Sequence, residues 1–154
     1  MEPPLEKVFN VKEIKDNIDR LIKIAEREIS LLKGQSHKLF IGGMSQGAAM
    51  AMATALQLTD KIGGILVCSG YYLDIIEINE NNLTTPLVIF HGARDKLRPW
   101  DQVKVTYDQL KKKKPDNTEI NIIDMHHECD VETVRARLNK LIQDQTSPLI
   151  SAKL

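Results

Sequence analysis

Apolar residues recur at spacings of three and four in the first part of the chain. They lie between Asn10, a residue type that caps helix starts, and Gly34, a residue type that ends helices. The set is Val11, Ile14, Ile18, Leu21, Ile22, Ala25, Ile29 and Leu32. One apolar stripe with charged residues opposite is typical of an amphipathic helix. We therefore predict a long helix between Asn10 and Gly34 that covers a sheet.

Four short apolar runs follow this helix. They occupy residues 39–41, 62–68, 87–90 and 120–123. The run at 62–68 is apolar without alternation, as expected of a parallel strand covered on both faces. Helical patterns at 46–58, 101–114 and 131–142 separate or follow these runs. The alternation predicts an α/β fold with about four parallel strands flanked by helices.

The remaining segments are expected to be irregular. Residues 70–85 read as a long loop with a short helical piece at 73–78. Residues 1–9 form an irregular lead-in, because Pro3 and Pro4 disfavour a helix there. A loose tail is expected from Thr146 onward. The chain of 154 residues thus predicts one domain over 10–145, between a lead-in at 1–9 and a tail at 146–154.

Composition narrows the classes of partner. Lys plus Arg and Asp plus Glu both number 21, so the formal net charge is zero and no nucleic-acid partner is indicated. No apolar run has the length of a membrane span or the form of a secretory signal, so a cytoplasmic location is expected. Cys68 and Cys129 lack metal-site spacing and are expected to be free thiols in a reducing compartment. We expect no cofactor and no metal.

The segment at 38–52 carries the strongest chemical signal. Ser45 lies between Gly43 and Gly47, which makes G-x-S-x-G at the junction of a predicted strand and a predicted helix. This context is typical of a nucleophile elbow, in which flanking glycines let the chain turn without a Cβ clash. The helix begins at the serine, so its N-terminal N–H groups would lie where an oxyanion forms.

An acid and a base follow later strands. Asp95 comes after the third strand, and His126 and His127 come after the fourth. Taken singly, Asp95 fits a charged turn and either histidine fits a surface loop. Ligands of parallel sheets bind at the carboxyl ends of the strands, however, and the order Ser, Asp, His is that of α/β-hydrolases. A histidine would take the proton of Ser45, and Asp95 would orient that histidine.

Four motifs resemble those of a known family. They are GGMSQGAAMA at 42–51, CSGYYL at 68–73, FHGARDKLRP at 90–99 and MHHE at 125–128. With them the sequence resembles the phospholipase/carboxylesterase family, which includes the acyl-protein thioesterases. The resemblance implies a serine hydrolase that cleaves acyl esters or thioesters through an acyl-enzyme. It assigns Ser45 as nucleophile, Asp95 as acid and the backbone N–H of Gln46 as one oxyanion donor. The implied substrate is a small acyl ester or an acylated protein.

The identity of the base stays open between neighbouring histidines. The spacing from Met125 fits His127 to a family motif, whereas the spacing to Cys129 fits His126 to another. We prefer His127 as the base, with His126 as the alternative.

The resemblance also implies that the fold is partial and N-terminally truncated. Family members carry additional strands and an HG-x-G-D-type loop before the long helix, and that loop supplies a second oxyanion N–H. This sequence has no such motif. The strand at 38–41 would then be an open edge, which pairs or aggregates unless it is covered. We expect a homo-oligomer, a larger assembly or residues 5–9 to cover it. The alternative to an enzyme is a catalytically impaired hydrolase-like module that serves as a structural or assembly subunit.

Overall fold

The computed structural model describes residues 10–151, so the lead-in expected at 1–9 lies outside the described residues. The helices are α1 (Val11–Leu31), α2 (Gln46–Gln57), α3 (Trp100–Lys113) and α4 (Val131–Ser151), with short 3-10 helices η2 (Ser36–Lys38) and η3 (Glu80–Asn82). The strands are β1 (Phe40–Met44), β2 (Gly64–Cys68), β3 (Leu87–Gly92) and β4 (Thr118–Ile123).

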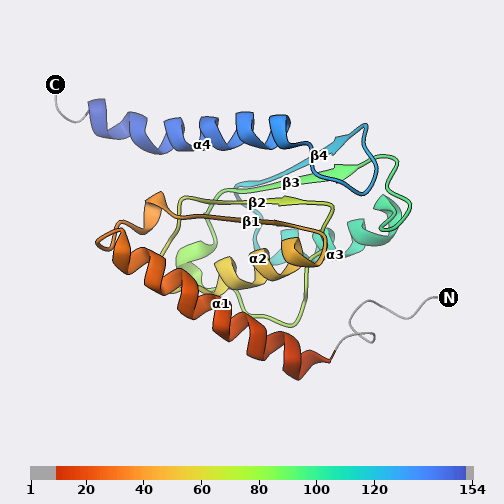
Figure 1. Cartoon of the computed structure of the whole chain (residues 1–154), viewed down its shortest axis with the longest axis horizontal. Coiled ribbons are helices and arrows are strands. Elements are labelled where there is room, and N and C mark those ends of the chain that lie inside the picture. The colour runs from red at the N-terminus through yellow and green to blue at the C-terminus, as the bar shows by residue number, and fades with distance from the viewer. Residues whose placement is uncertain (1–9, 152–154) are drawn as a thin grey trace.

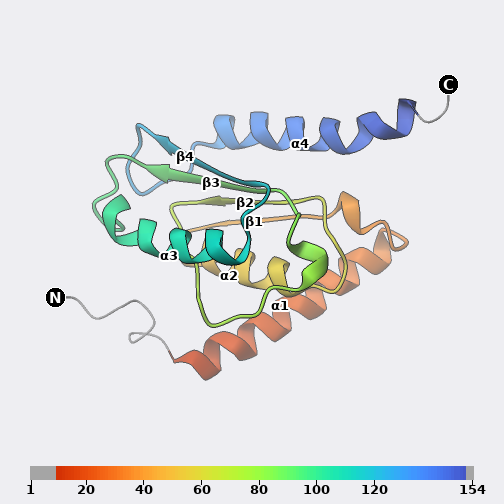
Figure 2. The same ribbon diagram turned by 180° about the vertical axis from the view of Figure 1, so that it is seen from behind.

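The strands form one parallel sheet in the order β1-β2-β3-β4. Helix α4 lies on one face of the sheet, and α2 and α3 lie on the other, with α1 outside α2 (Figures 1 and 2). The prediction of about four parallel strands flanked by helices is confirmed. In such a sheet all four carboxyl ends lie along one edge, which brings the loops after β1, β3 and β4 together.

Helix α1 begins and ends at the predicted signals. The side chain of Asn10 accepts a hydrogen bond from Glu13 N at 3.3 Å, which caps the helix start. After the last turn, Gly34 has a φ of 75° and its N–H donates to the carbonyl of Ile29. The apolar stripe buries Ile18, Ala25 and Ile29, and α1 packs mainly on α2.

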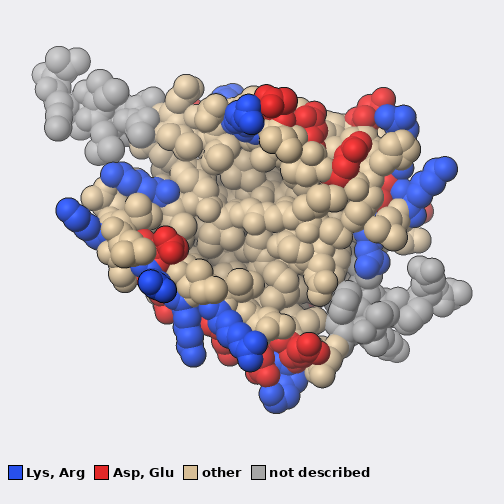
Figure 3. All heavy atoms as spheres, in the orientation of Figure 1, with Lys and Arg blue, Asp and Glu red and all other residues tan. Residues whose placement is uncertain are grey.

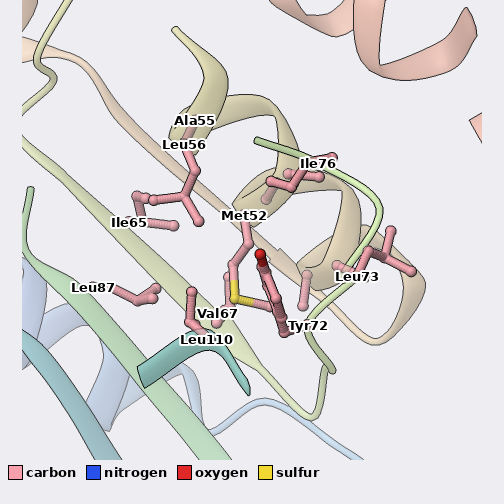
Figure 4. Packing of buried hydrophobic residues seen from close by; sticks show 14 of the residues in the cluster. Met52, Ala55, Leu56, Ile65, Val67, Tyr72, Leu73, Ile76, Leu87 and Leu110 are labelled. Carbon is pink, nitrogen blue, oxygen red and sulfur yellow. The ribbon is translucent and has the colours of Figure 1, made fainter. Parts of the chain in front are cut away.

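The main core lies between the sheet and α2. Strands β2 and β3 are buried along their whole length. Figure 4 shows Leu56 of α2 directed toward Ile65 of β2 and Met52 of α2 directed toward Val67 of β2. Burying one such side chain contributes roughly 1.5–3 kcal/mol to folding. This core fixes α2, and therefore the start of α2 beside the sheet edge.

The prediction of a short helix at 73–78 is wrong. Residues 73–78 form a turn, a bend and irregular backbone rather than a helix, although Leu73 and Ile76 are buried in the core. Helix α4 continues to Ser151, into the segment 146–154 that is expected to be a tail.

Strand β1 lies at an open edge of the sheet, as predicted. The carbonyl of Leu39 accepts from Gly63 N, and Ser45 N donates to the carbonyl of Cys68. Because backbone groups alternate in direction along a strand, Phe40, Gly42 and Met44 direct theirs away from β2. Among residues 10–151 no strand lies beyond β1.

An apolar groove runs along each side of this edge. The groove on the α1 side measures about 320 Å³, and its lining includes Ile24, Ile41 and Met50. The groove on the α4 side measures about 390 Å³ and is lined by residues such as Phe40 and Leu138. Figure 3 shows this face, in which Lys, Arg, Asp and Glu lie at the periphery and the hollowed centre carries none.

Candidate active site

Ser45 occupies a strained backbone position between β1 and α2. Its φ is 56° and its ψ is −124°, a combination that non-glycine residues rarely adopt. Backbone hydrogen bonds at the N–H and at the carbonyl of Ser45 hold this conformation. Ser45 N donates to the carbonyl of Cys68 at 2.9 Å, and Ala48 N donates to the Ser45 carbonyl at 3.1 Å. Strain of this kind costs about 1–3 kcal/mol and occurs mostly at functional sites.

The two glycines of the motif play different structural roles. A Cβ on Gly43 would lie 2.4 Å from the carbonyl oxygen of Gly47, so the elbow requires glycine there. A Cβ on Gly47 would meet no described atom within 4 Å. The expectation that both glycines avoid a clash is therefore correct for Gly43 and wrong for Gly47. Gly47 instead faces the open groove on the α1 side.

Asp95 lies in the turn after β3 with its carboxylate buried. Its Oδ1 accepts hydrogen bonds from Leu97 N at 3.0 Å and Arg98 N at 2.8 Å. Burial by itself raises the pKa of Asp95, but the hydrogen bonds from Arg98 and from His127 outweigh burial, and the pKa lies below its ordinary value. Asp95 is therefore an ionised acceptor at neutral pH.

His127, in the loop after β4, links Asp95 to Ser45. Its Nδ1 lies 2.8 Å from Asp95 Oδ2, and its Nε2 lies 2.9 Å from Ser45 Oγ. Because the carboxylate can only accept, Nδ1 carries the hydrogen in the neutral ring and Nε2 accepts from the serine hydroxyl. This arrangement can move a proton away from Ser45.

His126, the alternative base, points elsewhere. Its Nδ1 lies 3.2 Å from the carbonyl oxygen of Arg94, and its side chain is exposed. The structure therefore brings His127, and not His126, to Ser45 and Asp95. Two hydrogen bonds fix the path of the loop that carries both histidines. The Glu128 side chain accepts from His126 N at 3.1 Å, and Ser69 Oγ donates to the Glu128 carbonyl at 2.9 Å.

His91, on β3, supports the turn that carries Asp95. It is fully buried, and its Nε2 donates to the carbonyl of Arg98 at 2.8 Å. Burial lowers the pKa of His91, so the ring is neutral beside the carboxylate, 3.8 Å from Asp95 Oδ2. Its sequence position predicts a structural strand-end residue. Its hydrogen bond to Arg98, in the turn that carries Asp95, depends on the fold, and no local sequence pattern predicts it.

Gln46 is the first residue of α2. The first N–H groups of a helix have no acceptor within the helix, and they carry its positive dipole end. The backbone N–H of Gln46 therefore lies next to Ser45 as a candidate oxyanion donor. Within residues 10–151, no three His, Cys, Asp or Glu side chains are arranged to hold a metal ion.

Sequence comparison identifies the family of the chain. Residues 6–143 match the phospholipase/carboxylesterase family. The chain is 31% identical over 124 residues to acyl-protein thioesterase 1 of Gibberella zeae, covering 67% of this chain and 53% of that protein. It is 30% identical over 152 residues to acyl-protein thioesterase 1 of Yarrowia lipolytica, covering 89% and 65%. The chain thus spans about half to two thirds of the length of these two relatives.

Solved structures show the same fold. SOBER1 of Arabidopsis thaliana superimposes with a TM-score of 0.76 at 21% identity, covering 89% of this chain and 66% of that one. A Bacillus cereus carboxylesterase gives a TM-score of 0.67 at 12% identity, covering 88% and 63%. The fold is that of part of an α/β-hydrolase. The chain belongs to the phospholipase/carboxylesterase family.

Proposed function

We propose that this chain is a serine hydrolase that cleaves acyl esters or thioesters through an acyl-enzyme on Ser45. The observation that carries the proposal is the contact of one ring, His127, with Ser45 Oγ at 2.9 Å and with Asp95 Oδ2 at 2.8 Å. The acyl-protein thioesterase relatives support an acylated protein or a small acyl ester as substrate.

Each step uses groups whose positions are described above. His127 Nε2 takes the hydroxyl proton as Ser45 Oγ attacks the acyl carbon. The Gln46 N–H donates to the developing oxyanion. His127 then protonates the departing alcohol or thiol, and a water activated by the same ring releases the acid. Asp95 holds the ring with Nδ1 protonated and stabilises its positive charge.

The strained backbone of Ser45 supports this role. A φ of 56° for a serine costs free energy. Its consequence is that the side chain stands at the carboxyl edge of the sheet, within reach of a residue 82 positions later in the sequence. A purely structural module has no need of this geometry.

The proposal is tested by labelling with a fluorophosphonate, which reacts with activated serines. We expect the full chain to be labelled and Ser45→Ala not to be labelled, with Ser36→Ala as a labelled control. Hydrolysis of a short p-nitrophenyl ester and of an acyl thioester should be lost in parallel. A folded wild-type chain that gives neither labelling nor hydrolysis would contradict the proposal and favour the impaired structural module.

We further propose that the functional unit is a homo-oligomer in which a second copy covers the β1 edge. The edge directs unpaired backbone groups outward between two apolar grooves, and a zero net charge places no repulsion between copies. A larger assembly is the alternative. The cytoplasmic location likewise stays a prediction, and no helix in residues 10–151 is long and apolar enough to cross a membrane.

A further inference from the structure

The two cysteines of the chain meet beside the candidate active site. Cys68 ends β2, and Cys129 lies in the loop between β4 and α4. Both are free thiols, and their Sγ atoms are 2.9 Å apart although 61 positions separate them in the sequence. A short movement of either side chain would bring the sulfurs to the bonding distance of about 2.05 Å.

The pair differs in accessibility. Cys68 is 2% exposed, whereas Cys129 is partly exposed, and both line the groove of about 390 Å³ on the α4 side of the sheet. In the single chain this groove is open, so a molecule the size of a peroxide can reach Cys129 through it. Burial, reinforced by the contact with Cys129, raises the pKa of the Cys68 thiol. Cys129 is therefore the thiol that reacts first, and Cys68 the one that follows.

The pair also joins the two segments that hold Ser45 and His127 in contact. The carbonyl of Cys68 accepts from Ser45 N at 2.9 Å, and the next residue, Ser69, donates its hydroxyl to Glu128 at 2.9 Å. Cys129 follows Glu128 and lies two residues after His127. A bond between the cysteines would add a covalent link beside these hydrogen bonds.

We propose that Cys68 and Cys129 are a site of reversible oxidation, at which a peroxide produces an intramolecular disulfide. The sulfur of Cys129 attacks the O–O bond of hydrogen peroxide, which gives a sulfenic acid and one water. The sulfur of Cys68 then displaces the sulfenic oxygen, which forms the S–S bond and releases a second water. The two thiols lose two electrons and two protons, the peroxide accepts them, and a thiol reductant reverses the reaction.

The disulfide would stabilise the fold and fix the His127 loop. It closes a long loop in the unfolded chain, and bonds of this kind raise Tm by roughly 5–15 °C for a chain of this size. Amide hydrogen exchange at residues 125–130 should slow because the loop can no longer open away from β2. Neither effect requires Ser45 to be active, so the site does not depend on the proposed hydrolase activity.

The test treats the reduced full chain with hydrogen peroxide and measures intact mass, thiol content, Tm and hydrogen exchange. We expect the mass of a single chain, without an intermolecular disulfide, that has lost two hydrogens and both free thiols. Its Tm should be higher and hydrogen exchange in the His127 loop slower, and dithiothreitol should reverse all of these changes. Ser45→Ala should respond in the same way. Cys68→Ser and Cys129→Ser should each fail to lose two hydrogens and should keep the Tm of the reduced chain.

Three outcomes would overturn the inference. One is a wild-type chain that keeps both thiols under peroxide. Another is oxygen addition without loss of two hydrogens, which would mean that the cysteines oxidise separately. The third is a disulfide-linked dimer that persists in Cys68→Ser, which would mean that Cys129 pairs between molecules.

Discussion

The Nε2 atom of His127 lies 2.9 Å from the Oγ atom of Ser45, whereas the adjacent ring of His126 is directed at the carbonyl of Arg94. We predict that His127→Ala lowers kcat/KM for a p-nitrophenyl ester by at least about 10³-fold, because Ser45 loses its proton acceptor. His126→Ala, the matched control, should lower it less than about fivefold, since only an exposed loop contact is lost. Equal losses of kcat/KM in the two variants would contradict the assignment of His127 as the base.

A second prediction concerns the two glycines that flank Ser45. Gly43→Ala should lower the free energy of unfolding by about 3 kcal/mol, because its Cβ would lie 2.4 Å from the Gly47 carbonyl oxygen. Gly47→Ala should leave it unchanged or raise it by up to about 1 kcal/mol, since alanine favours a helix and meets no described atom within 4 Å. Urea denaturation followed by circular dichroism measures both. The elbow geometry described here would be wrong if Gly43→Ala were as stable as wild type.

The proposed homo-oligomer gives a third prediction. Ile24 of α1 is 58% exposed and lines the groove beside β1, whereas Val105 of α3 is 59% exposed and lies outside that groove. Ile24→Lys should convert an oligomer to a monomer, because it places a charge in the apolar contact. Val105→Lys should leave the oligomer intact. The measurement is light scattering after size exclusion under reducing conditions, and a monomeric wild type would contradict the homo-oligomer.

Lys114, at the end of α3, gives a prediction of pH dependence. Its side chain is fully buried and donates to the carbonyl of Asp116 at 2.8 Å. Its pKa is lowered from 10.5 to about 8, mainly by burial; the charge of Asp116 opposes this shift and the charge of Lys61 adds to it. Between pH 8 and 10.5 the unfolded chain therefore binds more protons, so stability should rise with pH through this interval. Below pH 8 the penalty for the buried charge is constant.

Replacing this lysine removes the titration. Lys114→Met should raise the free energy of unfolding at pH 7 by about 2 kcal/mol and flatten its rise above pH 8, because no charge is then buried. The exposed neighbour provides the control, since Lys112→Met should keep the rise of the wild type. Urea denaturation at several pH values between 7 and 10 measures the slope. A Lys114→Met profile parallel to that of the wild type would show that Lys114 titrates normally.

Local signals in the sequence were enough for most of the fold. Asn10 and Gly34 mark the two ends of α1. Both ends can be predicted because capping and chain reversal depend on only a few neighbouring residues. The sheet followed from uninterrupted apolar runs, since strands buried on both faces have no polar side. The elbow at Ser45 was also readable, because its glycine motif lies at a strand-to-helix junction.

Features that depend on distant contacts were not readable in this way. His126 and His127 lie in one loop. Which ring reaches Ser45 depends on the path of that loop, which the contacts of Ser69 and Glu128 fix. The loop at 70–85 was expected to hold a helix, but residues 73–78 form a turn, a bend and irregular backbone, with Leu73 buried in the core. The contact of the two cysteines joins the end of β2 to the loop after β4, 61 positions apart in the sequence, and local spacing carries no information about it.

The order of the strands has a consequence for how the chain is made. Each strand of the sheet pairs with the one synthesised immediately before it, so no strand has to insert between two others. The sheet can therefore assemble in the direction of translation, with each βα unit added to the edge left by the preceding one. Each new strand is therefore added on the side of the sheet where β4 finally lies. The β1 edge precedes the other three strands of this sheet in the chain, so it is available to a partner strand before Asp95 and His127 have been synthesised.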